Sequence, residues 1–185
     1  MREENIQTGG GWLDNFIEYV KQSIDIIQLN EDAIDQARGD EEAFMMGLVI
    51  IALGGIAEAI GSMSSFGLVF YPVIYVFSAI IFAVILHLLA TMLFKGSGDF
   101  IDFFRPYSLA FVLSWVNAIW VLNSVLAWVA GFWMLIVTGS ILERNYSLDR
   151  SRAIATVAIP VVVLLILWTV FVAAAIAAAL FLGLL

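Results

Sequence analysis

The sequence predicts an all-α, polytopic membrane protein, with five transmembrane helices preceded by a cytoplasmic or interfacial amphipathic helix. Three observations support this fold class. Of the 185 residues, 63% are hydrophobic and only 13% are charged, whereas soluble domains have about 25% charged residues. Three long segments after residue 42 carry almost no charge. Residues 1–42 hold 11 acidic and 3 basic side chains, whereas residues 43–185 hold five of each. We therefore expect an acidic N-terminal segment, 1–42, and a transmembrane domain, 43–185.

The acidic segment contains a predicted amphipathic helix. Apolar residues with helical spacing form one stripe: Leu13, Phe16, Ile17, Val20, Ile24 and Ile27. Charged residues follow the same spacing on the other side: Asp14, Glu18, Lys21 and Asp25. Such a stripe can pack against the rest of the protein, lie in the cytoplasmic membrane interface or dock on a partner. Asn30 is predicted to cap a second, short helix that ends at Arg38-Gly39.

The first two spans come from the segment 43–94, which holds 52 residues and a single formal charge, Glu58. A membrane-spanning helix needs about 20 residues, so this segment must fold back on itself. The sequence GSMSSFG, at 61–67, supplies the turn residues. The predicted helices cover approximately 43–62 and 67–94.

The next segment, KGSGDFIDFFRP at 95–106, is interpreted as a cytoplasmic connection whose aromatic rings dip into the interface between the charges. The uncharged run that follows, 106–142, is either one long helix or a hairpin of two helices. A hairpin with helices at 107–121 and 124–142 places all eight basic residues on one side of the membrane. One long helix would split them five to three, so the hairpin is preferred.

The last span is predicted as one long helix over 152–183, with Ser147 as its N-cap and a bend at Pro160. Five crossings leave the N-terminus in the cytoplasm and the C-terminus outside. The predicted location is the cell membrane, or an internal membrane in a eukaryote.

Two ionisable residues fall inside predicted spans. Glu58 is the only acid there, and a carboxylate in the middle of the bilayer costs about 2.5–3.5 kcal/mol on insertion scales. His87 is the only histidine and lies near the opposite end of its span. Because the two sit at different depths, a direct pair is not expected. A structural role in the bundle and a role in an ion or proton pathway both remain open.

Two stretches carry a family resemblance. GSGDFIDFFRPYSLAF contains Gly96, Gly98, Asp99, Phe100, Arg105 and Tyr107, and WMLIVTGSILERNYSLDRSRAIATVAIP contains Glu143, Arg150, Arg152 and Pro160. The first resembles the glycine-rich turn and Arg-x-Tyr-like helix entry of the Yip-domain family, five-span membrane proteins named for their interaction with Ypt/Rab GTPases. The second resembles that family's fourth helix and following loop. Pro106 stands before Tyr107 here, whereas the family often has a proline after this tyrosine.

The resemblance implies a short prokaryotic-type member with a scaffold, partner-binding or membrane-organising role, which is trafficking-related in eukaryotic relatives. Its motif residues are candidates for partner contact. The chain has no cysteine, no HExxH and no phosphate-binding loop, so we expect no enzyme, cofactor or metal site. The acidity disfavours nucleic acid as a partner and favours a basic protein surface. The alternatives are an accessory subunit of a larger membrane complex and a small transporter using Glu58 and His87.

Self-association is a further possibility. Four small residues lie in the first predicted span: Gly54, Gly55, Ala59 and Gly61. Such residues let helices approach closely, either within one chain or between two copies.

Overall fold

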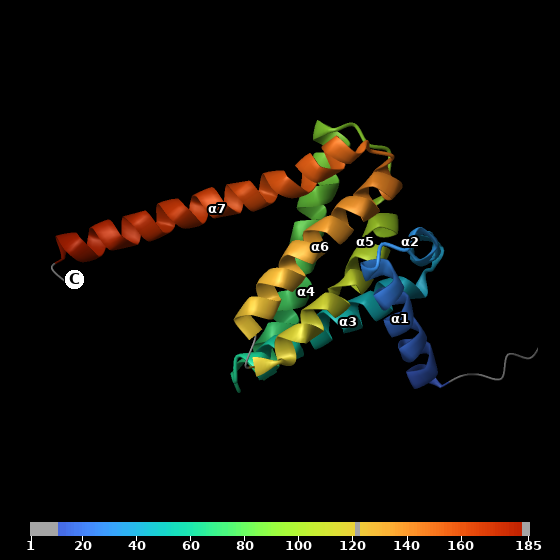
Figure 1. Ribbon diagram of the computed structural model, residues 1–185, viewed down its shortest axis with the longest axis horizontal. Coiled ribbons are helices and arrows are strands. Elements are labelled where there is room, and N and C mark those ends of the chain that lie inside the picture. Colours follow the sequence, from blue (N-terminus) through green and yellow to red (C-terminus); the bar gives the residue numbers. More distant parts are fainter. Residues whose placement is uncertain (1–10, 121–122, 183–185) are drawn as a thin grey trace, which may run out of the picture.

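The computed structural model describes residues 11–120 and 123–182, and every regular element in these ranges is helical (Figure 1). The elements are α1 (Trp12–Ile27), α2 (Glu31–Gly39), α3 (Glu42–Gly61), α4 (Gly67–Leu88), η1 (Leu89–Leu93), α5 (Phe100–Leu109), η2 (Ala110–Ala118), α6 (Asn123–Tyr146) and α7 (Arg150–Phe181). The segment η1 is π-helical and η2 is a 3-10 helix. Within the described ranges, four helices are long and apolar enough to cross a membrane: α3, α4 with η1, α6 and α7.

Helix α2 and the first two long helices begin and end close to the predicted residues. The Asn30 side chain accepts hydrogen bonds from the backbone N–H groups of Asp32 and Ala33, as expected of an N-cap, and α2 ends at Gly39. The turn between α3 and α4 occupies the interval between Gly61 and Gly67. Capping and turn chemistry are local properties, which explains why the sequence located them.

The third predicted span differs. We expected a connection up to Pro106 and a helix over 107–121, but α5 already begins at Phe100 and contains Pro106. Phe103 and Phe104 are fully buried in the core, so the expectation that they dip into the interface is wrong. Aromatic residues at positions 100, 103, 104 and 107 have helical spacing and can share one inward face. Asp102 and Arg105 pair with each other at 3.4 Å, so these two charges do not require a loop.

The combined element α5–η2 runs the length of the bundle. The end of α4 lies beside the end of α6, where His87 meets Tyr146, so the chain after α4 must travel to the opposite end before α6 begins. At about 1.5 Å per α-helical and 2.0 Å per 3-10 residue, α5–η2 extends roughly 33 Å. Runs of 3-10 helix beyond three or four residues are uncommon. The indole N–H of Trp115 and the amide of Asn117 bond to α3, and these contacts hold η2 in place.

The last helix is a single long element, as predicted, but Asp149 caps it in place of Ser147. Ser147 has a positive φ of 51°, so the chain turns there before α7 starts. In α7, Ala153, Thr156, Val157 and Pro160 are buried. Beyond Pro160 the helix projects past the other helices (Figure 1).

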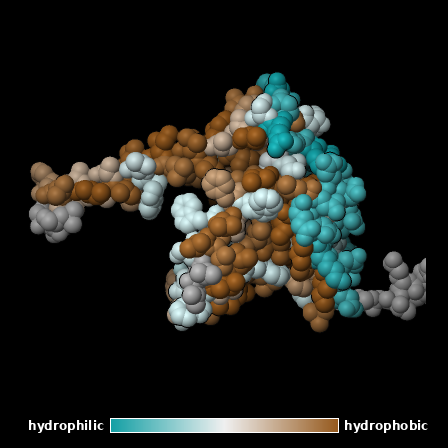
Figure 2. All heavy atoms as spheres, in the orientation of Figure 1, coloured by the Kyte–Doolittle hydropathy of each residue, from teal (hydrophilic) through white to brown (hydrophobic). Residues whose placement is uncertain are grey.

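The core lies between α3, α4, α5 and α6, and the hydrophilic surface gathers at one side over α1 and α2 (Figure 2). Fully buried residues come from each of the four core helices: Ile50, Ile51, Leu86, Phe103, Phe104, Leu109, Ile141 and Tyr146. Much of the remaining surface is apolar in Figure 2, as expected where lipid rather than water is the solvent.

The small residues of α3 form contacts within the chain. A Cβ added at Gly55 would lie 2.6 Å from the backbone of Tyr71 and Pro72 in α4, and one at Gly54 would lie 2.1 Å from the Ser114 hydroxyl of η2. These glycines therefore let α4 and η2 pack directly on α3.

We predict that Gly55→Ala destabilises the bundle by about 1–3 kcal/mol, because backbone atoms of α4 cannot give way as a flexible side chain could. Gly131→Ala is the matched control, since nothing lies within 4 Å of a Cβ added there in α6. The control should leave stability unchanged or raise it by up to about 1 kcal/mol. Unfolding of both variants in one detergent provides the comparison, and equal stabilities would contradict close α3–α4 packing.

Candidate functional site

The glycine motif, Gly96 and Gly98, forms a packing contact at one end of the bundle. We call this end, where the start of α5 and the end of α6 meet α2, the polar end. A Cβ added at Gly98 would lie 2.4 Å from the backbone oxygen of Asn145, and one at Gly96 would lie 2.8 Å from the Cβ of Tyr146. The contact is closed by hydrogen bonds from Ser97 N to Tyr146 O (3.3 Å) and from Asn145 Nδ2 to Asp99 O (3.0 Å). Only glycine permits this approach, so the motif locks the start of α5 against the end of α6.

The motif residues that follow extend this contact inward. Asp99 accepts a hydrogen bond from Ile101 N at 2.8 Å and thereby caps α5. The ring of Phe100 meets the His87 ring edge-on, with centroids 5.6 Å apart. Tyr107 is buried, with its ring 5.2 Å from that of Phe103. Phe100 and Tyr107 pack inside the bundle, whereas Asp99 is exposed at the start of α5.

The two intramembrane ionisable residues lie at opposite ends of the bundle. His87 Nδ1 lies 2.6 Å from the hydroxyl oxygen of Tyr146, a hydrogen-bond distance. Glu58 Oε2 accepts hydrogen bonds from Asn117 Nδ2 at 2.9 Å and from Tyr75 Oη at 3.3 Å. Separate partners at separate ends favour structural roles over a shared ion pathway. Tyr75 and Asn117 lie outside the two family stretches, and Tyr146 lies inside the second one but was not singled out from the sequence.

Charged side chains join α2 to the bundle. Arg105 Nη1 donates to the backbone oxygen of Arg38 at 2.8 Å, and Arg38 Nε lies 3.8 Å from Asp102. Arg144 pairs with both Glu31 and Asp35, and its Nε lies 3.2 Å from Asp35 Oδ1. The hydrogen bond from Arg144 lowers the pKa of Asp35 below its usual range. Arg105, a family-motif residue, thus supports the polar end from within.

The other motif residues lie around the junction of α6 and α7. Arg152 pairs with Asp149 at 3.0 Å, and Arg150 is exposed at the first position of α7. Glu143 is half-buried near the end of α6. Pro160 is buried near the point where α7 leaves the bundle. Glu143, Arg150 and Arg152 are therefore not brought together with the glycine motif, but they lie close to the same end.

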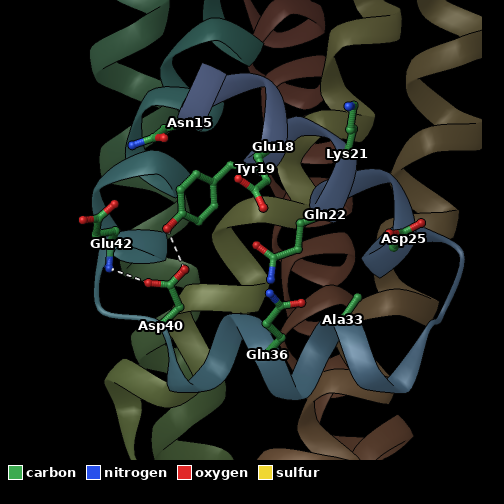
Figure 3. A pocket seen from close by; sticks show the side chains of 10 residues that line it. All are labelled: Asn15, Glu18, Tyr19, Lys21, Gln22, Asp25, Ala33, Gln36, Asp40 and Glu42. Carbon is green, nitrogen blue, oxygen red and sulfur yellow. Dashed lines mark hydrogen bonds between the residues drawn. The ribbon is translucent and has the colours of Figure 1, made fainter. Parts of the chain in front are cut away.

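An acidic cavity of about 340 Å³ lies between α1, α2 and the start of α3 (Figure 3). It is lined by Asn15, Glu18, Tyr19, Lys21, Gln22, Asp25, Ala33, Gln36, Asp40 and Glu42. Tyr19 Oη donates to Asp40 Oδ2 at 2.6 Å. Burial and this hydrogen bond raise the pKa of the Tyr19 phenol. Sequence patterning placed Glu18, Lys21 and Asp25 on one helix face, but it could not show that α2 closes the other side.

Within residues 11–120 and 123–182, no three His, Asp or Glu side chains lie close enough together to share a metal ion. The sequence model of the Yip1 domain matches residues 34–172. The chain belongs to the Yip1 domain family. No curated protein and no solved structure matches it. This Yip1-domain protein is accordingly a multi-pass membrane protein of a non-enzymatic family.

The matched residues cover the glycine motif, both intramembrane ionisable residues and most of α7. They begin inside α2, so α1 lies outside the match. Family membership therefore carries no expectation for α1 or for the cavity wall that α1 provides.

We predict that Glu58→Gln preserves the stability of the bundle, because the amide oxygen can accept the same two hydrogen bonds. Glu58→Leu should cost about 1–3 kcal/mol, because it leaves the donors of Tyr75 and Asn117 without this acceptor. Thermal unfolding of both variants in lipid nanodiscs tests this. If Glu58→Gln destabilises as much as Glu58→Leu, the carboxylate charge matters and the structural role is wrong.

Proposed function

We propose that this Yip1-domain protein is a non-catalytic scaffold that binds a basic protein partner at the polar end of its membrane bundle. The observation that carries the proposal is the acidic cavity between α1 and α2. Four carboxylates line it, from Glu18, Asp25, Asp40 and Glu42, against the single cation Lys21. A surface of this charge attracts lysine and arginine side chains and repels anionic partners.

The partner surface is assigned to the cavity and its rim. Asp99 and Arg105 make internal hydrogen bonds, so changing them would disturb α5 rather than a contact surface. Arg150 and Arg152 are exposed and remain candidates for contacts with an acidic part of the partner. Acidic and basic groups then lie near one end, which gives a partner both orientation and specificity.

We further propose that the chain crosses the membrane five times, with α5–η2 as the third crossing. Its length of roughly 33 Å matches a hydrocarbon core of about 30 Å. Seven of the eight basic residues are in the described ranges: Lys21, Arg38, Lys95, Arg105, Arg144, Arg150 and Arg152. Contacts among α2, α5 and α6 bring Arg38, Arg105 and Arg144 to one end, which agrees with a cytoplasmic placement.

The partner proposal is tested with a fluorescent hexalysine peptide and the full chain in nanodiscs of zwitterionic lipid. We expect the double variant Glu18→Gln/Asp25→Asn to bind the peptide more weakly. An exposed charge pair contributes about 0.2–1 kcal/mol, so the loss should be about 2- to 30-fold. The same measurement at high salt should reduce the difference, because exposed charges are screened.

The double variant Asp32→Asn/Glu41→Gln is the matched control. It removes the same charge from exposed positions that do not line the cavity. Peptide affinity of the control should stay near that of the unchanged protein. Equal weakening by both double variants would show that overall charge, not the cavity, attracts the peptide.

The five-crossing topology is tested with single cysteines, which are unique because the chain has none. We expect Ser65→Cys, in the α3–α4 turn, and Leu182→Cys, after α7, to react with a membrane-impermeant maleimide added outside sealed cells. Ser151→Cys, at the start of α7, should react only after the membrane is opened. Protection of Leu182→Cys together with Ser151→Cys would exclude an odd number of crossings.

A further inference from the structure

Helix α1 has two apolar faces, and contacts within the chain account for only one. Phe16, Ser23 and Ile26 face the bundle and are partly or fully buried. A second set, which we call the outer stripe, consists of Leu13, Ile17 and Ile24. These three side chains are 65%, 50% and 42% exposed. The stripe predicted from the sequence is therefore divided, and half of it remains uncovered.

Both halves of α1 are attached to segments that lie among the apolar helices. The ring of Phe16 stacks on Trp115 of η2, with centroids 6.4 Å apart. The indole N–H of Trp133, in the candidate span α6, donates to the backbone oxygen of Ile27 at 2.7 Å. Tryptophan is enriched at membrane interfaces, where its ring is in the apolar region and its N–H finds a polar partner. These contacts hold α1 against the membrane-embedded body.

We propose that the outer stripe inserts into the lipid interface on the side of the membrane where α1 lies. Its occupant is the bilayer itself, at the boundary between headgroups and acyl chains. Interfacial helices bury their apolar face about 5–10 Å into this boundary. The stripe is then continuous with the lipid-facing surface of the bundle, and its exposure in the isolated chain is explained.

The charges of α1 agree with this orientation. Ile17 is followed by Glu18 and Ile24 by Asp25, so each charge lies about 100° around the helix from its apolar neighbour. Glu18 and Asp25 line the acidic cavity, away from the buried face. With the outer stripe in lipid, this charged side is directed toward water, where its charges stay hydrated.

Charge also distinguishes lipid from a second copy of the chain. Helix α1 carries three acids, Asp14, Glu18 and Asp25, against Lys21, for a net charge of −2. Pairing two outer stripes would bring two helices of net charge −2 close together and cost energy by repulsion. The same charge means that anionic headgroups do not draw α1 to the membrane, so apolar burial must drive its insertion.

The test uses spin labels on single cysteines in the full chain, reconstituted in phosphatidylcholine vesicles without any partner. Labels at Ile17→Cys and Ile24→Cys should be several-fold more accessible to oxygen, which enters the bilayer, than to a water-soluble nickel complex. Labels at Glu18→Cys and Asp25→Cys, one residue further along, should show the reverse preference. These matched pairs share one helix and one fold, so the comparison does not depend on how well each variant is expressed.

Three outcomes would overturn the proposal. Equal access of the nickel complex to all four positions would place the stripe in water. Exclusion of both reagents from positions 17 and 24 would show a protein cover, and spin–spin broadening that disappears on dilution with unlabelled chain would identify a second copy. Because no partner is present, failure here leaves the cavity proposal untouched.

Discussion

The close approach of the Gly96–Asp99 segment to the last turn of α6 positions much of the bundle. Backbone contact at Gly98, only possible without a side chain, brings the end of α4 and the start of α5 beside Asn145 and Tyr146. From this point the chain has to cross the bundle before α6 can begin. The path of α5–η2 through the core therefore follows from one steric constraint together with the direction of α6.

Polar groups inside the bundle act mainly as connections between helices. Glu58 joins α3 to α4 and η2, His87 joins α4 to α6, and Trp115 joins η2 to α3. In an apolar environment an unpaired polar group is costly, so each such bond also selects one arrangement of its helices. Two of these bonds, from Trp115 and Asn117, connect the 3-10 segment η2 to α3.

The polar end combines a rigid base with a surface suited to recognition. Residues of the family motif form the base, whereas the acidic cavity owes one wall to α1, outside the matched domain. Gly96, Gly98 and Tyr107 pack against other helices of the chain, and residues that fix the fold need not touch a partner.

The sequence by itself determined the all-helical membrane class, the positions of α2, α3 and α7, and the resemblance to the Yip family. It could do so because apolar runs, caps and turns are local patterns. Tertiary structure decided where α5 starts. From the sequence, the charges of Asp102 and Arg105 suggested a solvent-exposed loop, but in the structure these two residues pair with each other and Phe103 is buried. It also decided how the apolar stripe of α1 divides and how the acidic cavity closes. These features depend on contacts between residues far apart in the chain, and periodicity does not encode such contacts.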